Sequence, residues 1–110
     1  GESCVCAAAR EVCEETGLNV SDLRLAGTVN WENLDTGARY VVFLYRTSSF
    51  TGTLIPATEE GENFWVRREE LRSMELCPNF AEYLPIFFGE GFTEMYGTYG
   101  ENIPDTLHLL

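Results

Sequence analysis

The hydrophobic positions near the start of the chain predict an amphipathic helix. Ala7, Ala8 and Val12 recur at helical spacing, so they share one small apolar face that suits packing flat on a sheet. Ser3 is a residue type that caps helix N-termini, and Gly17 is the type that most often ends a helix in a left-handed conformation. We therefore expect a helix that begins after Ser3 and stops at Gly17.

Further along the chain, alternating apolar residues and short β-branched runs predict strands. Residues 23–31 alternate in the manner of a half-buried strand. The run at 38–47 is almost continuously β-branched and aromatic, so we expect it in the middle of a sheet that is covered on both sides. Residues 64–67 and 92–99 predict two shorter strands, and residues 100–110 predict a tail or an edge segment.

Turns and further helices separate these strands. Residues 32–37 have the composition of a turn, and the acidic, Gly-containing stretch at 58–63 predicts a loop. Residues 68–74 predict a short helix, and residues 80–88 predict a longer helix with Asn79 as its cap. The expected order is helix, strand, strand, acidic loop, strand, short helix, helix and strand.

Three carboxylates share the polar side of the first helix. Glu11, Glu14 and Glu15 stand at i, i+3 and i+4, a spacing at which like charges repel one another and weaken an isolated helix. A hard divalent cation such as Mg²⁺ offsets this repulsion, because it takes oxygen ligands and bridges carboxylates to phosphate oxygens. The alternative interpretation is a solvated acidic helix face.

Length, composition and charge limit the function classes. At 110 residues, 45% of them hydrophobic, the chain suits one globular domain. Its net charge of −11 argues against a duplex nucleic-acid binder, which needs a basic face. A free nucleotide stays compatible with that charge, because a bound divalent cation neutralises phosphate locally. All seven basic residues are arginine, which removes lysine nucleophile and Schiff-base chemistry.

The cysteines and the lack of a long apolar run bear on the compartment. No stretch reaches the roughly 20 apolar residues of a membrane span, and nothing resembles a signal peptide. Cys4 and Cys6 stand two apart beside one helix and point to different faces, so they neither pair nor chelate zinc well. We interpret the four cysteines as structural or incidental thiols and expect a cytoplasmic location with no membrane partner.

One segment carries a resemblance to a known family. Arg10-Glu-Val-Cys-Glu-Glu-Thr-Gly-Leu18 resembles the second half of the Nudix box, and Glu2 stands eight positions before Arg10, where the first Glu of that box belongs. The opening Gly of the box would lie before residue 1, so this chain starts inside the motif. The fixed Arg, Glu and Gly positions make the signature specific, and the chain resembles the Nudix hydrolase family.

The resemblance continues along almost the whole chain. Residues 39–45 and the Phe-Trp-Val run at 64–66 are similar to bacterial MutT-like 8-oxo-dGTP diphosphatases. The family implies an α/β (α+β) fold, a Nudix-type α/β/α sandwich around a mixed sheet, with residues 1–110 as a single domain. The strands that precede the box helix in that fold are not in this chain. We therefore expect an N-terminally truncated domain that either is unstable or associates, with unpaired strand edges as one route to association and a homodimer as one form of it.

The Nudix resemblance implies Mg²⁺-dependent hydrolysis of a pyrophosphate bond in a nucleoside diphosphate derivative, with Mn²⁺ as the alternative metal. The expected substrate is a small-molecule nucleotide, 8-oxo-dGTP or another (d)NTP, cleaved to the monophosphate and pyrophosphate. Divalent ions held by carboxylates screen the phosphate charge, orient the phosphates and lower the pKa of bound water. By the resemblance, Glu11, Glu14 and Glu15 are the metal ligands.

The resemblance also implies supporting roles around these ligands. Arg10 matches the box arginine and is expected to orient Glu14 with its forked donors. Glu2 matches the first box Glu, which contacts metal through water or assists in activating water. A further ligand or general base is expected from the acidic loop, where Glu60 is the first choice before Glu59 and Glu62. The alternative for the loop glutamates is a solvent-facing turn.

Base recognition is the least specific part of the sequence. Trp31, Tyr40 and Trp65 are aromatic residues able to stack on a purine, and Asn30 and Asn79 are amides able to bond a base edge. The alternative for each aromatic residue is a place in the core, and for Asn79 it is the helix cap.

Two other functions stay open at this point. One is an ADP-ribose or other nucleotide-sugar pyrophosphatase, and the other is a non-catalytic Nudix-fold module that binds a nucleotide. The intact glutamate triad disfavours the module, because a chain without turnover has no need to keep three mutually repelling carboxylates.

Overall fold

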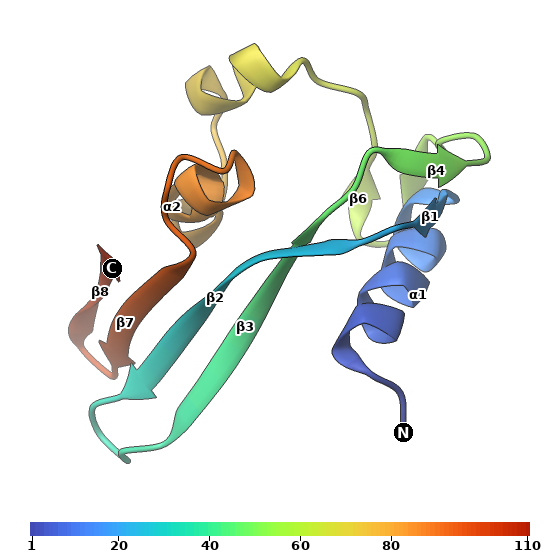
Figure 1. Ribbon diagram of the computed structural model, residues 1–110. Coiled ribbons are helices and arrows are strands. Elements are labelled where there is room, and N and C mark those ends of the chain that lie inside the picture. Colours follow the sequence, from blue (N-terminus) through green and yellow to red (C-terminus); the bar gives the residue numbers. More distant parts are fainter. The chain divides into compact units, whose positions relative to one another are not determined.

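The computed structural model describes residues 1–110, and their contacts divide the chain into two compact units (Figure 1). Residues 1–24 and 45–75 form the first unit, and residues 25–44 and 76–110 form the second. The first unit holds helix α1 (Cys4–Thr16), strands β1 (Asn19–Ser21), β4 (Ser49–Thr51), β5 (Ala57–Thr58) and β6 (Gly61–Glu62), and the 3-10 helix η1 (Arg68–Ser73). The second unit holds most of β2 (Arg24–Asn33) and β3 (Arg39–Arg46), with helix α2 (Pro78–Phe87), β7 (Glu94–Gly100) and β8 (Ile103–Leu109). None of the helices is both long enough and apolar enough to cross a membrane.

Two short antiparallel strand pairs accompany α1 in the first unit. β1 pairs with β4, so that Val20 lies opposite Phe50. β5 pairs with β6 in a hairpin in which Thr58 lies opposite Gly61, and Glu59 and Glu60 form the turn between them. α1 contacts both β1 and β5. Its predicted apolar face is half-buried, and among the buried hydrophobic residues only Leu18 belongs to this unit.

The second unit is built on a four-stranded mixed sheet with the order β3-β2-β7-β8. β2 runs parallel to β7, with Trp31 opposite Gly97, and β7 runs antiparallel to β8. The parallel pair requires a long crossover, because β2 and β7 are separated by β3, the first-unit segment 45–75 and α2. The expectation of a mixed sheet is therefore confirmed.

Helix α2 covers one face of this sheet and completes the core. The buried cluster consists of Val29, Trp31, Leu44, Ile86 and Met95. Trp31 is 2% exposed, and its indole Nε1–H donates to the Tyr83 hydroxyl at 3.0 Å. This bond satisfies the one polar atom of the ring inside an apolar environment. The core of the second unit is thus contiguous and joins β2, β3 and β7 to α2.

Strand β3 occupies an edge of the sheet, which corrects the expectation that residues 38–47 form a central strand. Tyr40, Val41 and Phe43 are all exposed. A continuous apolar run predicts a strand, but it does not show whether that strand has neighbours on both sides or lies at the edge of the sheet. The predicted edge segment at the C-terminus is confirmed, because β8 forms the opposite edge of the sheet.

Two further expectations were wrong. Residues 64–67 form no strand; their backbone belongs to none of the sheets, and Trp65 instead packs on Phe50 with ring centroids 5.3 Å apart. Strand propensity acts only where a partner strand is present. Asn79 does not cap α2, because the helix begins at Pro78 and Cys77 occupies the N-cap without a side-chain bond. Proline is favoured at the first helical position, where its missing N–H costs nothing.

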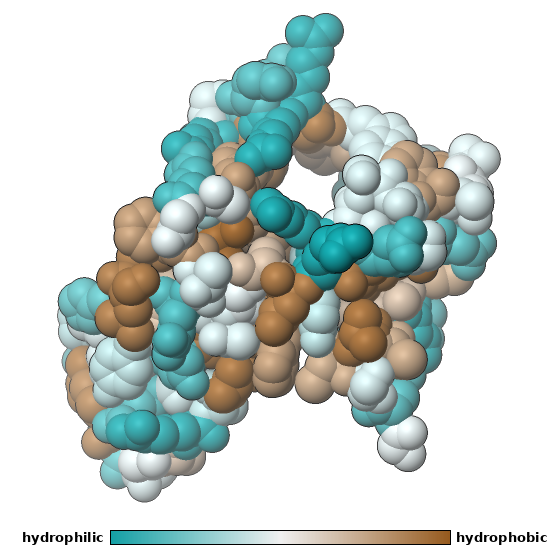
Figure 2. All heavy atoms as spheres, in the orientation of Figure 1, coloured by the Kyte–Doolittle hydropathy of each residue, from teal (hydrophilic) through white to brown (hydrophobic).

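Apolar side chains reach the surface, whereas no polar or charged side chain is buried. Figure 2 shows hydrophobic residues in brown among hydrophilic ones on the face drawn. The aromatic pair Phe64 and Trp65 is exposed to 62% and 65%. Because every charged side chain contacts solvent, all the glutamates of the expected site are accessible to a ligand.

Gly97→Ala is expected to destabilise the second unit. A Cβ at this position would lie 2.7 Å from two ring atoms of Trp31 and 2.8 Å from Leu107 Cδ2. Overpacking of this kind costs about 1–3 kcal/mol. Urea unfolding followed by tryptophan fluorescence measures the change, with Glu101→Ala as an exposed control in the turn after β7 that should stay within about 0.5 kcal/mol of the parent. An unchanged midpoint for Gly97→Ala would contradict the packing described here.

Candidate active site

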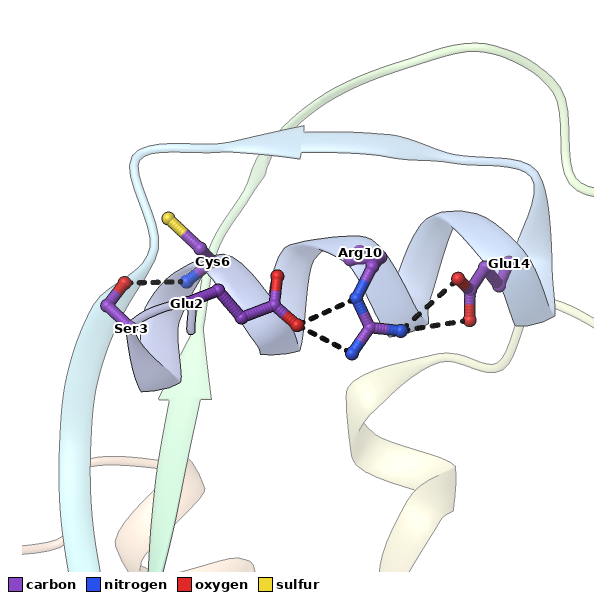
Figure 3. Close-up of polar contacts among 5 residues, drawn as sticks. All are labelled: Glu2, Ser3, Cys6, Arg10 and Glu14. Atoms are coloured by element: carbon purple, nitrogen blue, oxygen red, sulfur yellow. Dashed lines mark hydrogen bonds and ion pairs between the residues drawn. The ribbon is translucent and has the colours of Figure 1, made fainter.

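Local interactions fix both ends of helix α1, as the sequence predicted. The Ser3 hydroxyl accepts a hydrogen bond from the backbone N–H of Cys6 at 3.2 Å (Figure 3). At the other end Gly17 has a φ of 79° and donates its N–H to the Cys13 carbonyl at 2.9 Å. A Cβ on residue 17 would lie 2.9 Å from Ile55 Cγ2, so both the conformation and the available space call for glycine.

Arg10 joins Glu2, which precedes the helix, to Glu14 in its last turn (Figure 3). Its Nε and Nη2 atoms donate to Glu2 Oε1 at 2.8 Å and 2.7 Å. Its Nη1 atom lies 3.2 Å from each carboxylate oxygen of Glu14. The structure therefore brings together three of the four residues expected to be catalytic. A guanidinium is suited to this bridge, because its donors project in a rigid fork toward two separate carboxylates.

The bridge orients the carboxylates more than it stabilises the fold. Hydrogen bonds to Glu2 and then to Glu14 raise the pKa of Arg10 above its ordinary value, so the guanidinium is charged at every physiological pH. All three side chains are exposed, and exposed ion pairs contribute little to stability because water and salt screen them. The consequence is a Glu14 carboxylate held in one orientation with lone pairs still available on both oxygens.

The other two helix glutamates make no such contacts. Glu11 and Glu15 are exposed, and neither side chain takes part in an ion pair or a hydrogen bond. No group of three His, Cys, Asp or Glu side chains lies close enough to form a ready-made metal cluster. The donor set nevertheless fits a hard divalent cation, because accessible carboxylates on one helix supply the oxygen ligands that Mg²⁺ prefers.

The C-terminal turn of α1 adds to the negative potential. Glu14 and Glu15 lie in the last turn, which contains no basic residue. The negative end of a helix dipole repels acidic side chains, so this placement is unfavourable for the helix alone. It favours a cation at the same end, because carboxylates and helix dipole attract it together.

The acidic hairpin β5–β6 is bonded to this same turn. The Ile55 N–H donates to the Thr16 carbonyl at 2.9 Å, and the Asn63 side-chain amide donates to the Glu15 carbonyl at 2.7 Å. Glu60 lies at the hairpin turn, where its backbone N–H donates to the Thr58 hydroxyl at 3.1 Å. Its carboxylate is exposed. Glu60 is thus carried by a loop that is attached to the end of the glutamate helix.

Sequence reasoning passed over Asn63. Its partner on α1 is 48 residues away along the chain, so no local pattern connects them. Asparagine directly after an acidic, Gly-containing stretch is an ordinary turn residue, and this position gave no further signal.

The aromatic residues considered for base stacking differ in exposure. Trp31 lies in the core of the second unit, which is the alternative that its alternating strand allowed. Tyr40 is 49% exposed on β3, and its ring meets Tyr99 edge-on at 6.0 Å. Burial of part of its surface raises the pKa of the Tyr40 hydroxyl, and the neighbouring Tyr99 raises it further. Trp65 is exposed in the first unit beside Phe50.

Asn79 lines a pocket of about 280 Å³ in the second unit. The pocket is lined by Pro78, Asn79, Glu82, Asp105 and Leu107. Its walls combine apolar surface with hydrogen-bond acceptors and one amide. Asn30, the other amide considered, donates instead to Glu94 Oε1 at 3.4 Å.

A family model and a solved structure both match this chain. A family model described as the NUDIX domain matches residues 1–87. A crystal structure of the mutator MutT protein from Bacillus halodurans superposes with a TM-score of 0.77 at 21% sequence identity, over 99% of this chain and 74% of that chain. The expected fold class is thereby confirmed. The comparison with curated protein sequences gives no match.

Ser3→Ala is expected to destabilise α1 by about 0.5–2 kcal/mol, because it removes the hydroxyl that accepts the Cys6 N–H. The loss should appear as a lower free energy of unfolding in urea, together with weaker helical circular dichroism before the transition. Ser3→Asp is the matched control, since a carboxylate also caps helices, and it should retain most of the parent stability. Equal losses in both variants would show that the cap does not set the start of the helix.

Proposed function

This chain belongs to the NUDIX family of hydrolases, which act on pyrophosphate bonds, and we propose that its substrate is 8-oxo-dGTP or another (d)NTP. Hydrolysis adds water across one phosphoanhydride bond and releases a nucleoside monophosphate and pyrophosphate. The observation that carries the proposal is the bridge from Glu2 through Arg10 to Glu14. Beside it, the exposed Glu11 and Glu15 side chains make no hydrogen bond or ion pair.

The position of the acidic residues supports a catalytic rather than a structural role. Glu14 and Glu15 lie at the helix end where the dipole is unfavourable to them, and they repel one another and Glu11. A purely structural helix would gain stability from lysine or arginine at these positions. The chain has carboxylates there, which fits a site that binds a cation.

A divalent cation supplies charge neutralisation for the phosphates and lowers the pKa of bound water. We assign Glu11, Glu14 and Glu15 as the residues that hold it, with Mg²⁺ as the proposed ion and Mn²⁺ as the substitute. Arg10 holds Glu14 in place through two contacts of 3.2 Å. Its positive charge also offsets the repulsion between Glu2 and Glu14.

Proton transfer from the attacking water requires an acceptor that is deprotonated when the water attacks. Glu2 and Glu60 are the proposed candidates, the first fixed by Arg10 and the second carried by the acidic hairpin. Both side chains are exposed, so both are accessible to water. A carboxylate becomes neutral when it accepts the proton, so it no longer repels the negative charge that develops on the phosphate.

For the base, Tyr40 and Asn79 stay the proposed contacts. Tyr40 has an exposed ring for stacking, and Asn79 contributes an amide to a pocket with hydrogen-bond acceptors. Trp31 is not proposed again, because its surface is taken up by the core. A nucleic-acid partner is not proposed, since the net charge of −11 repels a polyphosphate backbone.

The cytoplasm is the proposed compartment. All four cysteines are free and exposed, and a reducing environment keeps such thiols from forming disulfides between molecules.

The test is product analysis over a panel of 8-oxo-dGTP, ordinary dNTPs, ADP-ribose and dinucleotides. We expect release of pyrophosphate from 8-oxo-dGTP or another (d)NTP, and a loss of at least about a hundredfold in kcat for Glu14→Gln and for Glu15→Gln. The magnitude follows because loss of a group that merely supports a metal ligand already costs about 10- to 100-fold. Glu69→Gln, which removes the same charge from η1, is the matched control and should keep parent activity.

Each result of the panel has a distinct meaning. If only ADP-ribose or a nucleotide sugar is hydrolysed, the proposed substrate class is wrong, but the proposed hydrolysis of a pyrophosphate bond still holds. Nucleotide binding in a calorimeter without any turnover would overturn the enzyme assignment in favour of a binding module. Full activity of Glu14→Gln would remove Glu14 from the site.

Removal of divalent metal is expected to reduce hydrolysis to background. The physical reason is that the glutamates and the substrate phosphates repel one another unless a cation lies between them. Activity should be measured after treatment with a chelator, and again after excess Mg²⁺ or Mn²⁺ is added as the control for irreversible damage. Undiminished hydrolysis in the chelator would contradict the assigned role of the three glutamates.

A further inference from the structure

Asn63 is the residue that attaches the acidic hairpin to the glutamate helix, and the catalytic scheme above does not use it. Its side-chain nitrogen donates to the Glu15 carbonyl at 2.7 Å and to the Ile55 carbonyl at 3.1 Å. Its backbone N–H donates to the Pro56 carbonyl at 2.9 Å. The side chain is half-buried. Its bond to the Ile55 carbonyl is partly shielded from competing water, whereas its bond to the Glu15 carbonyl is exposed.

The two carbonyls belong to different segments of the first unit. Glu15 lies in the last turn of α1, whose carbonyls have no partner within the helix. Ile55 lies just before β5, and its own N–H donates to the Thr16 carbonyl at 2.9 Å. The segment from Ile55 to Asn63 is therefore bonded at both of its ends to the final turn of the helix.

This segment contains the whole acidic hairpin. β5, the Glu59-Glu60 turn and β6 all lie between the two attachment points. The hairpin itself has only two paired residues on each strand, which is too short to hold a fixed orientation alone. Its placement relative to Glu14 and Glu15 consequently depends on the bonds at Ile55 and Asn63.

We propose that Asn63 is a positioning residue that sets the Glu60 hairpin against the metal-binding end of α1. This inference rests on the proposed function, because it gives Asn63 a role in metal binding and turnover through Glu60 and Glu15. An amide is the group that the geometry needs. Its NH₂ carries two donors on one nitrogen and can serve two carbonyls at once, whereas a carboxylate offers only acceptors and would repel both.

The test compares Asn63→Ala and Asn63→Asp with Asn33→Ala as the matched control. The Asn33 side chain also makes two bonds to backbone, accepting from Asp35 N–H at 2.8 Å and from Thr36 N–H at 3.3 Å, but it belongs to the second unit. Its loss therefore removes a similar number of bonds without touching the hairpin. The readouts are Mn²⁺ affinity by electron paramagnetic resonance, kcat and KM over a Mg²⁺ titration, and amide hydrogen exchange.

For both Asn63 variants we expect Mn²⁺ affinity to fall by about 10- to 100-fold, the range seen when groups that support a metal ligand are removed. The Mg²⁺ concentration for half-maximal activity should rise in parallel, while KM for nucleotide at saturating Mg²⁺ changes much less. Hydrogen exchange should accelerate across residues 55–63. Asn33→Ala should unfold at lower urea concentration with unchanged Mn²⁺ affinity and Mg²⁺ dependence.

These outcomes separate the inference from the proposed function. If both Asn63 variants bind Mn²⁺ and exchange amide hydrogens as the parent protein does, the positioning role is overturned even if the enzyme is active. A parent protein that hydrolyses none of the panel would instead overturn the proposed substrate class, and the Mn²⁺ and exchange measurements would still decide the role of Asn63. If Asn33→Ala lost as much Mn²⁺ affinity as the Asn63 variants, that would count against the inference, because it would reveal a general effect of reduced stability.

Discussion

The C-terminal end of helix α1 is the point on which the first unit depends. A helix leaves its last carbonyls without internal partners, and each must find a donor elsewhere. Here Gly17 turns the chain and caps the Cys13 carbonyl, while Ile55 and Asn63 supply donors to the Thr16 and Glu15 carbonyls. The same bonds that end the helix therefore attach the acidic loop to it. Glycine at position 17 makes this possible, because any side chain would occupy the space that Ile55 fills.

The balance of forces differs between the two units. The second unit has a contiguous apolar core in which the Trp31 ring is held between sheet and helix. The first unit contributes only Leu18 to the buried hydrophobic residues, and its helix ends in carboxylates that repel one another. Hydrogen bonds at the helix ends thus carry a larger share of its organisation. A cation bound to Glu11, Glu14 and Glu15 would relieve the repulsion, so metal binding there would also stabilise this unit.

Helix α1 was predicted well, because its ends are set by residues close together in the sequence. Features that depend on contacts between residues far apart in the sequence could not be predicted. Ser3 and Gly17 define the helix ends through chemistry confined to a few neighbouring residues, so their roles could be inferred from residue type and spacing. The edge position of β3 depends on which strands are beside it, and the irregular backbone around Trp65 depends on the lack of a partner strand. Asn63 could not be recognised from the sequence for the same reason, since the carbonyl that it binds is 48 residues away.

The spacing between Glu2 and Arg10 has a geometric cause. Two turns of α-helix take about seven residues, so Arg10 lies on the same side of the helix as Ser3 at its start. Ser3 is the N-cap with extended backbone angles, φ −70° and ψ 162°, and Glu2 precedes it outside the helix. The guanidinium fork then reaches back to Glu2 and forward by four residues to Glu14. A lysine, with one ammonium group, would not offer separate planar donors to the two carboxylates. The motif spacing, the serine cap and the arginine therefore act together. They hold Glu2, ahead of the helix, and Glu14, in its last turn, to the single positive charge of Arg10.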